Sequence, residues 1–88
     1  MQQKNLVIRD PLGLHARPAG LLAKAAQRYS CDIHLSIAAK GKRASAKKLF
    51  ELMSLEAAAG DELLLQTDGE DEQQALEAIG TLIAERLG

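Results

Sequence analysis

The sequence has few aromatic residues, one cysteine and no long apolar run. Tyr29 and Phe50 are its only aromatic side chains, so aliphatic residues must build the core, and no row of aromatics is available to stack on nucleic-acid bases. Because Cys31 has no partner, an internal disulfide and a cysteine-rich metal site are excluded, which favours a reducing compartment. No apolar stretch approaches the roughly 20 residues that span a bilayer, and the N-terminus has no secretion signal. We therefore expect a cytoplasmic protein that does not insert into a membrane.

The length and charge of the chain narrow the possible functions. Its 88 residues suffice for a single domain, residues 1–88, with one modest core. A substrate cleft between two lobes needs a longer chain, so the size favours an accessory or carrier protein. The formal net charge of −1 gives no overall attraction to nucleic acid or to a membrane surface, so any electrostatic role must come from local patches. We expect a monomer that does not bind nucleic acid.

Hydrophobic periodicity predicts seven secondary-structure elements. Alternating apolar residues bounded by turn residues predict strands, and apolar residues recurring every three or four positions predict helices. The predicted strands are residues 3–9, 32–37, 42–46 and 62–67, and the predicted helices are residues 16–29, residues 47–55 and a last one that follows the acidic run 69–72 and continues through Leu87. The order β-α-β-β-α-β-α predicts an α+β fold in which three helices cover one face of a four-stranded antiparallel sheet.

The chemically informative segment is GLHARPA, residues 13–19, at the start of the first predicted helix. A neutral imidazole has a free lone pair near physiological pH, so His15 can act as a nucleophile. The first turn of a helix presents backbone amides without partners, and these favour a bound phosphate. Ala16 and Arg17 supply such amides, and the Arg17 guanidinium adds a permanent charge suited to phosphoryl oxygens. Pro18 sets the helix start, because its fixed φ suits the first turn and its missing N–H costs nothing there.

A histidine alone is most often a surface residue without a chemical task, but here each neighbour meets a separate need of a phosphohistidine. The segment GLHARPA resembles the active-site signature of HPr, the histidine-containing phosphocarrier of the bacterial phosphoenolpyruvate-dependent phosphotransferase system. The similarity extends over the whole chain and includes SAKKLFELMSL (45–55) and GEDEQQALEAI (69–79). The resemblance implies an open-faced β-sandwich with a phosphoryl group on Nδ1 of His15. It also implies Enzyme I as donor and an EIIA-type protein or domain as acceptor, with no cofactor and no turnover without these partners.

Two segments are predicted to form a docking surface for the partners. On the first helix, one face opposite the apolar stripe is basic with a single leucine. Its residues are Arg17, Leu21, Lys24 and Arg28. The short second helix is apolar on too many sides to be buried completely in so small a domain. Leu52 and Leu55 are expected in the core, and the resemblance to HPr adds four other residues to the docking surface. These are Lys47, Leu49, Phe50 and Met53.

The sequence departs from the family pattern at three places. Lys48 occupies the position that matches a kinase-regulated serine of Gram-positive relatives, so kinase control at this position is not expected. Glu56 replaces a common glycine, as in the nitrogen-branch paralogue NPr, and the hairpin near residues 38–41 has two extra residues. These differences leave open whether the chain serves the sugar branch or the nitrogen branch of the phosphotransferase system. They also leave open whether it is one domain of a multiphosphoryl transfer protein.

Two other functions compete with phosphoryl transfer. In a regulatory binding module, contacts through the basic and apolar surface would matter more than phosphoryl transfer, and His15 would be dispensable. Binding of nucleic acid through the sheet is disfavoured, because the predicted strands carry no stacking aromatics. No metal site is expected either, since His34 has no second ligand at a suitable spacing.

Overall fold

The computed structural model describes residues 1–86, and its elements follow the predicted order. The strands and helices in this range are β1 (Gln2–Val7), α1 (Ala16–Ala26), β2 (Asp32–Ile37), β3 (Lys42–Ser45), α2 (Leu49–Ser54), β4 (Glu62–Asp68) and α3 (Glu72–Thr81). A short 3₁₀ turn, η1 (Ala38–Lys40), joins β2 to β3, and a wider helical turn, η2 (Leu82–Arg86), extends α3. Leu87, which the periodicity places in the last helix, lies outside the described residues.

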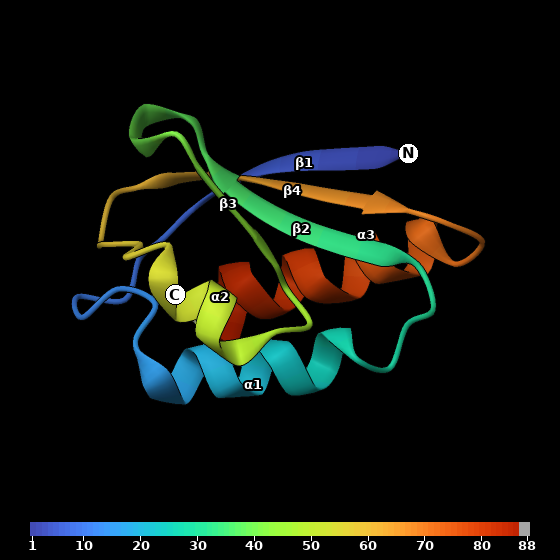
Figure 1. Ribbon diagram of the computed structural model, residues 1–88, viewed down its shortest axis with the longest axis horizontal. Coiled ribbons are helices and arrows are strands. Elements are labelled where there is room, and N and C mark those ends of the chain that lie inside the picture. Colours follow the sequence, from blue (N-terminus) through green and yellow to red (C-terminus); the bar gives the residue numbers. More distant parts are fainter. Residues whose placement is uncertain (87–88) are drawn as a thin grey trace.

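The strands form one antiparallel sheet in the order β1-β4-β2-β3. The register places Leu6 of β1 opposite Leu63 of β4, and Leu35 of β2 opposite Leu65 of β4, so the inward-facing leucines lie side by side. All three helices cover the same face of the sheet, and the other face is open (Figure 1). The predicted α+β fold with its helices on one side is confirmed.

The core lies between the sheet and the three helices and is almost entirely aliphatic. Its most deeply buried large side chains come from every layer and include Leu22, Leu35, Leu52, Leu65 and Ile79. Burial of each such side chain contributes roughly 1.5–3 kcal/mol relative to its exposed state. Leu52 and Leu55 are both buried, as predicted. The core therefore fastens α1 and α2 to the sheet and fixes the start of α1 in space.

Helix α1 has 11 residues and ends earlier than predicted, at Ala26 rather than Tyr29. The amides of Arg28 and Tyr29 bond to carbonyls only three residues back, at Ala25 and Ala26, so the chain tightens into a turn. The Tyr29 carbonyl then accepts a hydrogen bond of 2.6 Å from Lys47 Nζ. Because this partner comes from a distant part of the chain, periodicity alone could not locate the helix end. No helix within residues 1–86 is long and apolar enough to cross a membrane.

Asp71, at the start of α3, holds the connection between α1 and β2. Its carboxylate accepts hydrogen bonds from the amides of Ser30 and Cys31, both at 2.9 Å. The bond from the Ser30 amide is the largest cause that lowers the pKa of Asp71 from 3.8 to about 2. Burial, reinforced by Asp71, raises the pKa of the Cys31 thiol to about 11. A buried thiol with a raised pKa is a structural residue and a poor nucleophile.

Replacing Asp71 with asparagine is expected to destabilise the fold in a pH-dependent way. Because the pKa of Asp71 in the folded state lies below its ordinary value, the carboxylate stabilises the fold fully above about pH 4 and loses this effect as the pH falls towards 2. The difference in free energy of unfolding between wild type and Asp71→Asn, measured by urea denaturation, should be largest near neutral pH and shrink over that acidic range. A difference that stays constant with pH contradicts this account.

Candidate functional site

His15 lies at the amino end of α1 and presents a free imidazole. It is the N-cap residue, with extended backbone angles (φ −85°, ψ −174°), and its carbonyl accepts a hydrogen bond of 3.0 Å from the Ala19 amide. Its side chain makes no capping hydrogen bond and is 38% exposed. The backbone of His15 therefore starts the helix, while its ring stays available for chemistry.

Asp10 orders the loop before His15 and faces the imidazole. Its carbonyl accepts the Gly13 amide and its Oδ1 accepts the Leu12 amide, each at 2.9 Å. Its Oδ2 lies 3.7 Å from Nε2 of His15, too far for a hydrogen bond but close enough for electrostatic attraction. A carboxylate at this place favours the tautomer with its proton on Nε2, which leaves the lone pair on Nδ1. In the sequence, Asp10 directly follows the first predicted strand, residues 3–9, and only the folded loop brings it to His15.

The first turn of α1 offers two backbone amides beside the imidazole. Within residues 1–86, the amides of Ala16 and Arg17 have no hydrogen-bond partner, as expected at a helix start. Both residues are exposed, whereas Pro18 is buried and anchors the turn. The partial positive charge at this end of the helix and the Arg17 guanidinium both favour an anion next to His15. The structure thus brings together the four residues that the motif singled out.

Gly13 allows the loop to rest directly on the segment after α2. Its φ is +71°, and a Cβ at this position would lie 2.2 Å from the Ala57 carbonyl oxygen and 3.0 Å from Ala58 Cα. The next residue, Leu14, donates its amide to the same Ala57 carbonyl at 2.9 Å. Only a glycine meets both the left-handed backbone and the close approach. The position of His15 therefore depends on the Ala57–Ala58 backbone.

An apolar and basic surface extends from the site along α1 and α2. Helix α2 packs against α1, and the three apolar docking side chains discussed next are exposed on these helices. Their exposed fractions are 83% for Phe50, 51% for Leu21 and 39% for Met53. Lys24 and Arg28 are exposed as well, and both line a groove with Leu21 although Arg28 lies beyond the end of α1. Leu12, in the loop before His15, is 77% exposed and was not predicted, because a loop has no periodicity to indicate which side chains face outward.

The chain matches the family described as "PTS HPr component phosphorylation site" over residues 2–85. It belongs to the HPr family. As a member of this family, it is a phosphocarrier of the phosphotransferase system, and membership implies interaction with Enzyme I and EIIA.

Several HPr-family proteins are similar to this chain over nearly its whole length. The phosphocarrier protein HPr of Haemophilus influenzae is 43% identical over 83 residues, which are 94% of this chain and 95% of the relative. The HPr-like protein Crh of Bacillus subtilis is 39% identical over 87 residues, 99% of this chain and 100% of the relative. A crystal structure of Crh, described as an intertwined dimer with a swapped domain, has a TM-score of 0.73, is 40% identical, and covers 94% of this chain and 93% of its own. A crystal structure of HPr from Thermoanaerobacter tengcongensis has a TM-score of 0.87 and 34% identity, with 94% of this chain and 91% of its own covered. This match confirms the HPr fold.

Two residues that the HPr resemblance placed in the docking surface are held by internal contacts. Lys47 donates its ammonium to the Tyr29 carbonyl at 2.6 Å, and its own carbonyl accepts a hydrogen bond of 2.9 Å from Gln27 Nε2. Leu49 is partly buried and packs against the core. Lys47 therefore joins the start of α2 to the end of α1, and Leu49 packs α2 against the core. Lys48, whose position the sequence comparison matched to a regulated serine, is the exposed N-cap residue of α2, and its Nζ lies 3.6 Å from Glu51 Oε2.

Proposed function

We propose that this phosphocarrier accepts a phosphoryl group from Enzyme I on Nδ1 of His15 and passes it to an EIIA protein or domain. The observation that carries the proposal is the partly exposed, uncapped imidazole at the start of α1, followed by two amides that are unpaired within residues 1–86 and by the exposed Arg17. This arrangement suits a covalent phosphohistidine, because it combines a nucleophile with donors for the phosphoryl oxygens.

The transfer needs little covalent chemistry from the protein. The Nδ1 lone pair of His15 attacks the phosphorus of the donor phosphohistidine, a new N–P bond forms, and the donor's N–P bond breaks as its imidazole leaves with the electron pair. His15 keeps its Nε2 proton and gains positive charge, which the Asp10 carboxylate at 3.7 Å offsets. The amides of Ala16 and Arg17 and the Arg17 guanidinium stabilise the negative charge spread over the phosphoryl oxygens. Transfer to the acceptor is the same step in reverse.

The experiment that tests this function uses the wild-type protein with phosphoenolpyruvate, Mg²⁺ and Enzyme I. Mass spectrometry at alkaline pH should detect one added phosphoryl group, which is lost in acid, and ¹⁵N NMR should locate it on Nδ1 of His15. Subsequent addition of an EIIA protein should remove it. No added phosphoryl group overturns the proposal and leaves a binding module as the better account, and a group on Nε2 overturns the assigned atom.

The exposed side chains of α1 and α2 are proposed to dock both partners. Basic residues favour an acidic partner surface, and the apolar side chains among them supply the contacts that hold it. The docking residues proposed are Arg17, Leu21, Lys24, Arg28, Phe50 and Met53, while Lys47 and Leu49 hold the start of α2 in place through Tyr29 and the core.

Replacing Phe50 with alanine is expected to raise the KM for phosphorylation by Enzyme I about 10-fold and leave kcat nearly unchanged, because a large exposed ring contributes mainly to binding. Steady-state kinetics of phosphoryl transfer measure both constants. Val7→Ala is the matched control. Val7 is also an exposed apolar residue, but it lies at the end of β1, away from α1 and α2. Equal effects of the two substitutions on KM argue against docking through Phe50.

We further place this phosphocarrier in the cytoplasm as a monomer. β1 pairs with β4 of the same chain, an arrangement that requires no exchange of strands between two copies. Light scattering distinguishes the mass of one chain from that of a dimer such as Crh.

A further inference from the structure

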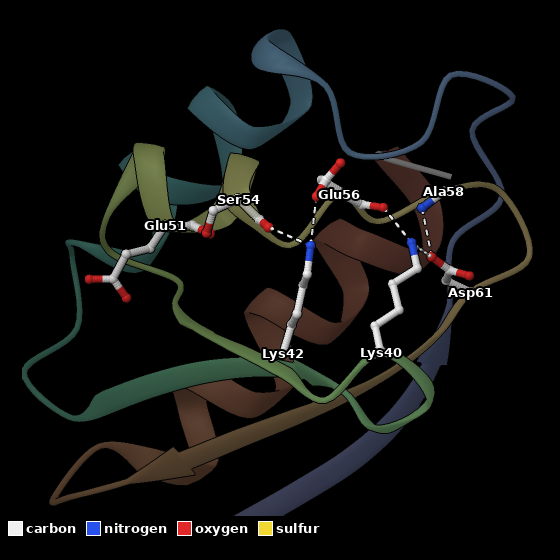
Figure 2. A network of polar contacts seen from close by, with 7 residues as sticks. All are labelled: Lys40, Lys42, Glu51, Ser54, Glu56, Ala58 and Asp61. Carbon is white, nitrogen blue, oxygen red and sulfur yellow. Dashed lines mark hydrogen bonds and ion pairs between the residues drawn. The ribbon is translucent and has the colours of Figure 1, made fainter.

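Two lysines of the β2–β3 hairpin hold the segment between α2 and β4, residues 56–61 (Figure 2). Lys42 Nζ donates to Glu56 Oε1 at 2.6 Å and to the Ser54 carbonyl at 3.3 Å. Lys40 Nζ donates to the Glu56 carbonyl at 2.6 Å and lies 2.9 Å from Asp61 Oδ2. Each ammonium thus bridges a backbone carbonyl near the end of α2 and a carboxylate of the following segment.

These contacts hold a backbone conformation that Glu56 would otherwise rarely adopt. Its φ is +52°, in the left-handed region, which disfavours any residue with a Cβ. Lys42 binds its carboxylate and Lys40 binds its carbonyl, so both halves of the residue are fixed. The hydrogen bond from Lys42 also lowers the pKa of the Glu56 carboxyl.

The other side of the same segment supports the loop that carries His15. The Ala57 carbonyl accepts the Leu14 amide at 2.9 Å, and the Ala57–Ala58 backbone leaves no room for a side chain at Gly13. The segment also exchanges backbone hydrogen bonds with the end of β1. The Ile8 amide donates to the Asp61 carbonyl, and the Gly60 amide donates to the Ile8 carbonyl. A shift of residues 56–61 would therefore move the loop and His15 with it.

We propose that Lys40 and Lys42 are positioning residues for phosphoryl transfer, which fix residues 56–61 as the support for the His15 loop. This inference rests on the proposed transfer through His15. Displacement of a reacting group by about 1 Å can lower the reaction rate by a large factor. Loss of the contacts made by Lys40 and Lys42 should therefore affect the chemical step more than partner binding. Neither lysine contacts His15, and both act through the Ala57 carbonyl and Gly13.

The test compares Lys42→Met with Arg43→Met. Both remove one positive charge from the same strand, but Arg43 is exposed on the other side of β3 and makes no ion pair within residues 1–86. At a temperature well below the unfolding transition of each variant, Lys42→Met should lower kcat about 5-fold or more with little change in KM. It should also alter the hydrolysis rate of the isolated phosphohistidine, which needs no partner. Arg43→Met should match the wild type in both measurements.

A second substitution separates positioning from general stability. Glycine adopts the left-handed conformation without strain, so Glu56→Gly in the Lys42→Met background should restore kcat and the phosphohistidine lifetime. The positioning role is overturned if Lys42→Met lowers only thermal stability, if Arg43→Met causes the same loss, or if the Glu56→Gly double variant stays impaired. Absence of a phosphoryl group on His15 in the wild type is a different result, because it overturns the proposed function itself and this role with it.

Discussion

Replacing His15 with alanine is expected to lower phosphoryl transfer by at least about 1,000-fold, to the background of the assay, because no other side chain at this helix start supplies a nucleophile. The neighbouring residues Ala16, Arg17 and Pro18 are proposed to position and stabilise the group, and none of them has a side chain that could hold it covalently. The measurement is the rate of phosphoryl transfer from Enzyme I, with the mass of the product as a second readout.

The same variant should keep its fold and its docking surface. His15 starts α1 through its backbone carbonyl, which alanine retains, and its side chain makes no capping bond. His15→Ala should therefore inhibit phosphorylation of the wild type competitively, with an inhibition constant near the KM of the wild type. A variant that still gains a phosphoryl group shows that the nucleophile lies elsewhere. Loss of competitive inhibition together with an unchanged circular dichroism spectrum contradicts the proposed docking surface.

Replacing Gly13 with alanine is expected to cause the largest loss of stability among single substitutions at the site, about 3 kcal/mol. The new Cβ would lie 2.2 Å from the Ala57 carbonyl oxygen, so the loop must move away and lose the hydrogen bond between Leu14 and Ala57. A left-handed φ of +71° adds strain. Thermal denaturation followed by circular dichroism should give a Tm lower by roughly 12 °C or more, since about 4–8 °C corresponds to 1 kcal/mol in a domain of this size.

Gly41→Ala is the control that isolates the close approach. Gly41 has a similar φ of +64°, but no atom lies within 4 Å of its hypothetical Cβ. Its substitution should cost only the backbone strain, about 1 kcal/mol. Equal losses of stability at the two positions would indicate that the loop can move away from Ala57 at little cost in free energy. Phosphoryl transfer should fall in Gly13→Ala and persist in Gly41→Ala, because only the first displaces His15.

Much of the fold could be predicted, because its signals are local. Alternation in residues 32–37 and 62–67 places both central strands within one residue of their observed bounds, Asp32–Ile37 and Glu62–Asp68. The ends of helices were less predictable. The turn after Ala26 is held by the hydrogen bond from Lys47 to the Tyr29 carbonyl, and no repeating sequence pattern indicates a contact between residues so far apart in the chain.

The sequence by itself determined the class of fold and pointed to the residues proposed to carry the chemistry, because strand alternation, helical periodicity and the GLHARPA segment all depend on residues close together in the chain. Only the tertiary structure decided which residues hold that site in place. Asp10 faces the ring of His15, Ala57 supports Gly13, and Lys42 meets Glu56 across the hairpin. The physical reason is that a contact between distant segments exists only once the core has fixed the sheet and helices relative to one another.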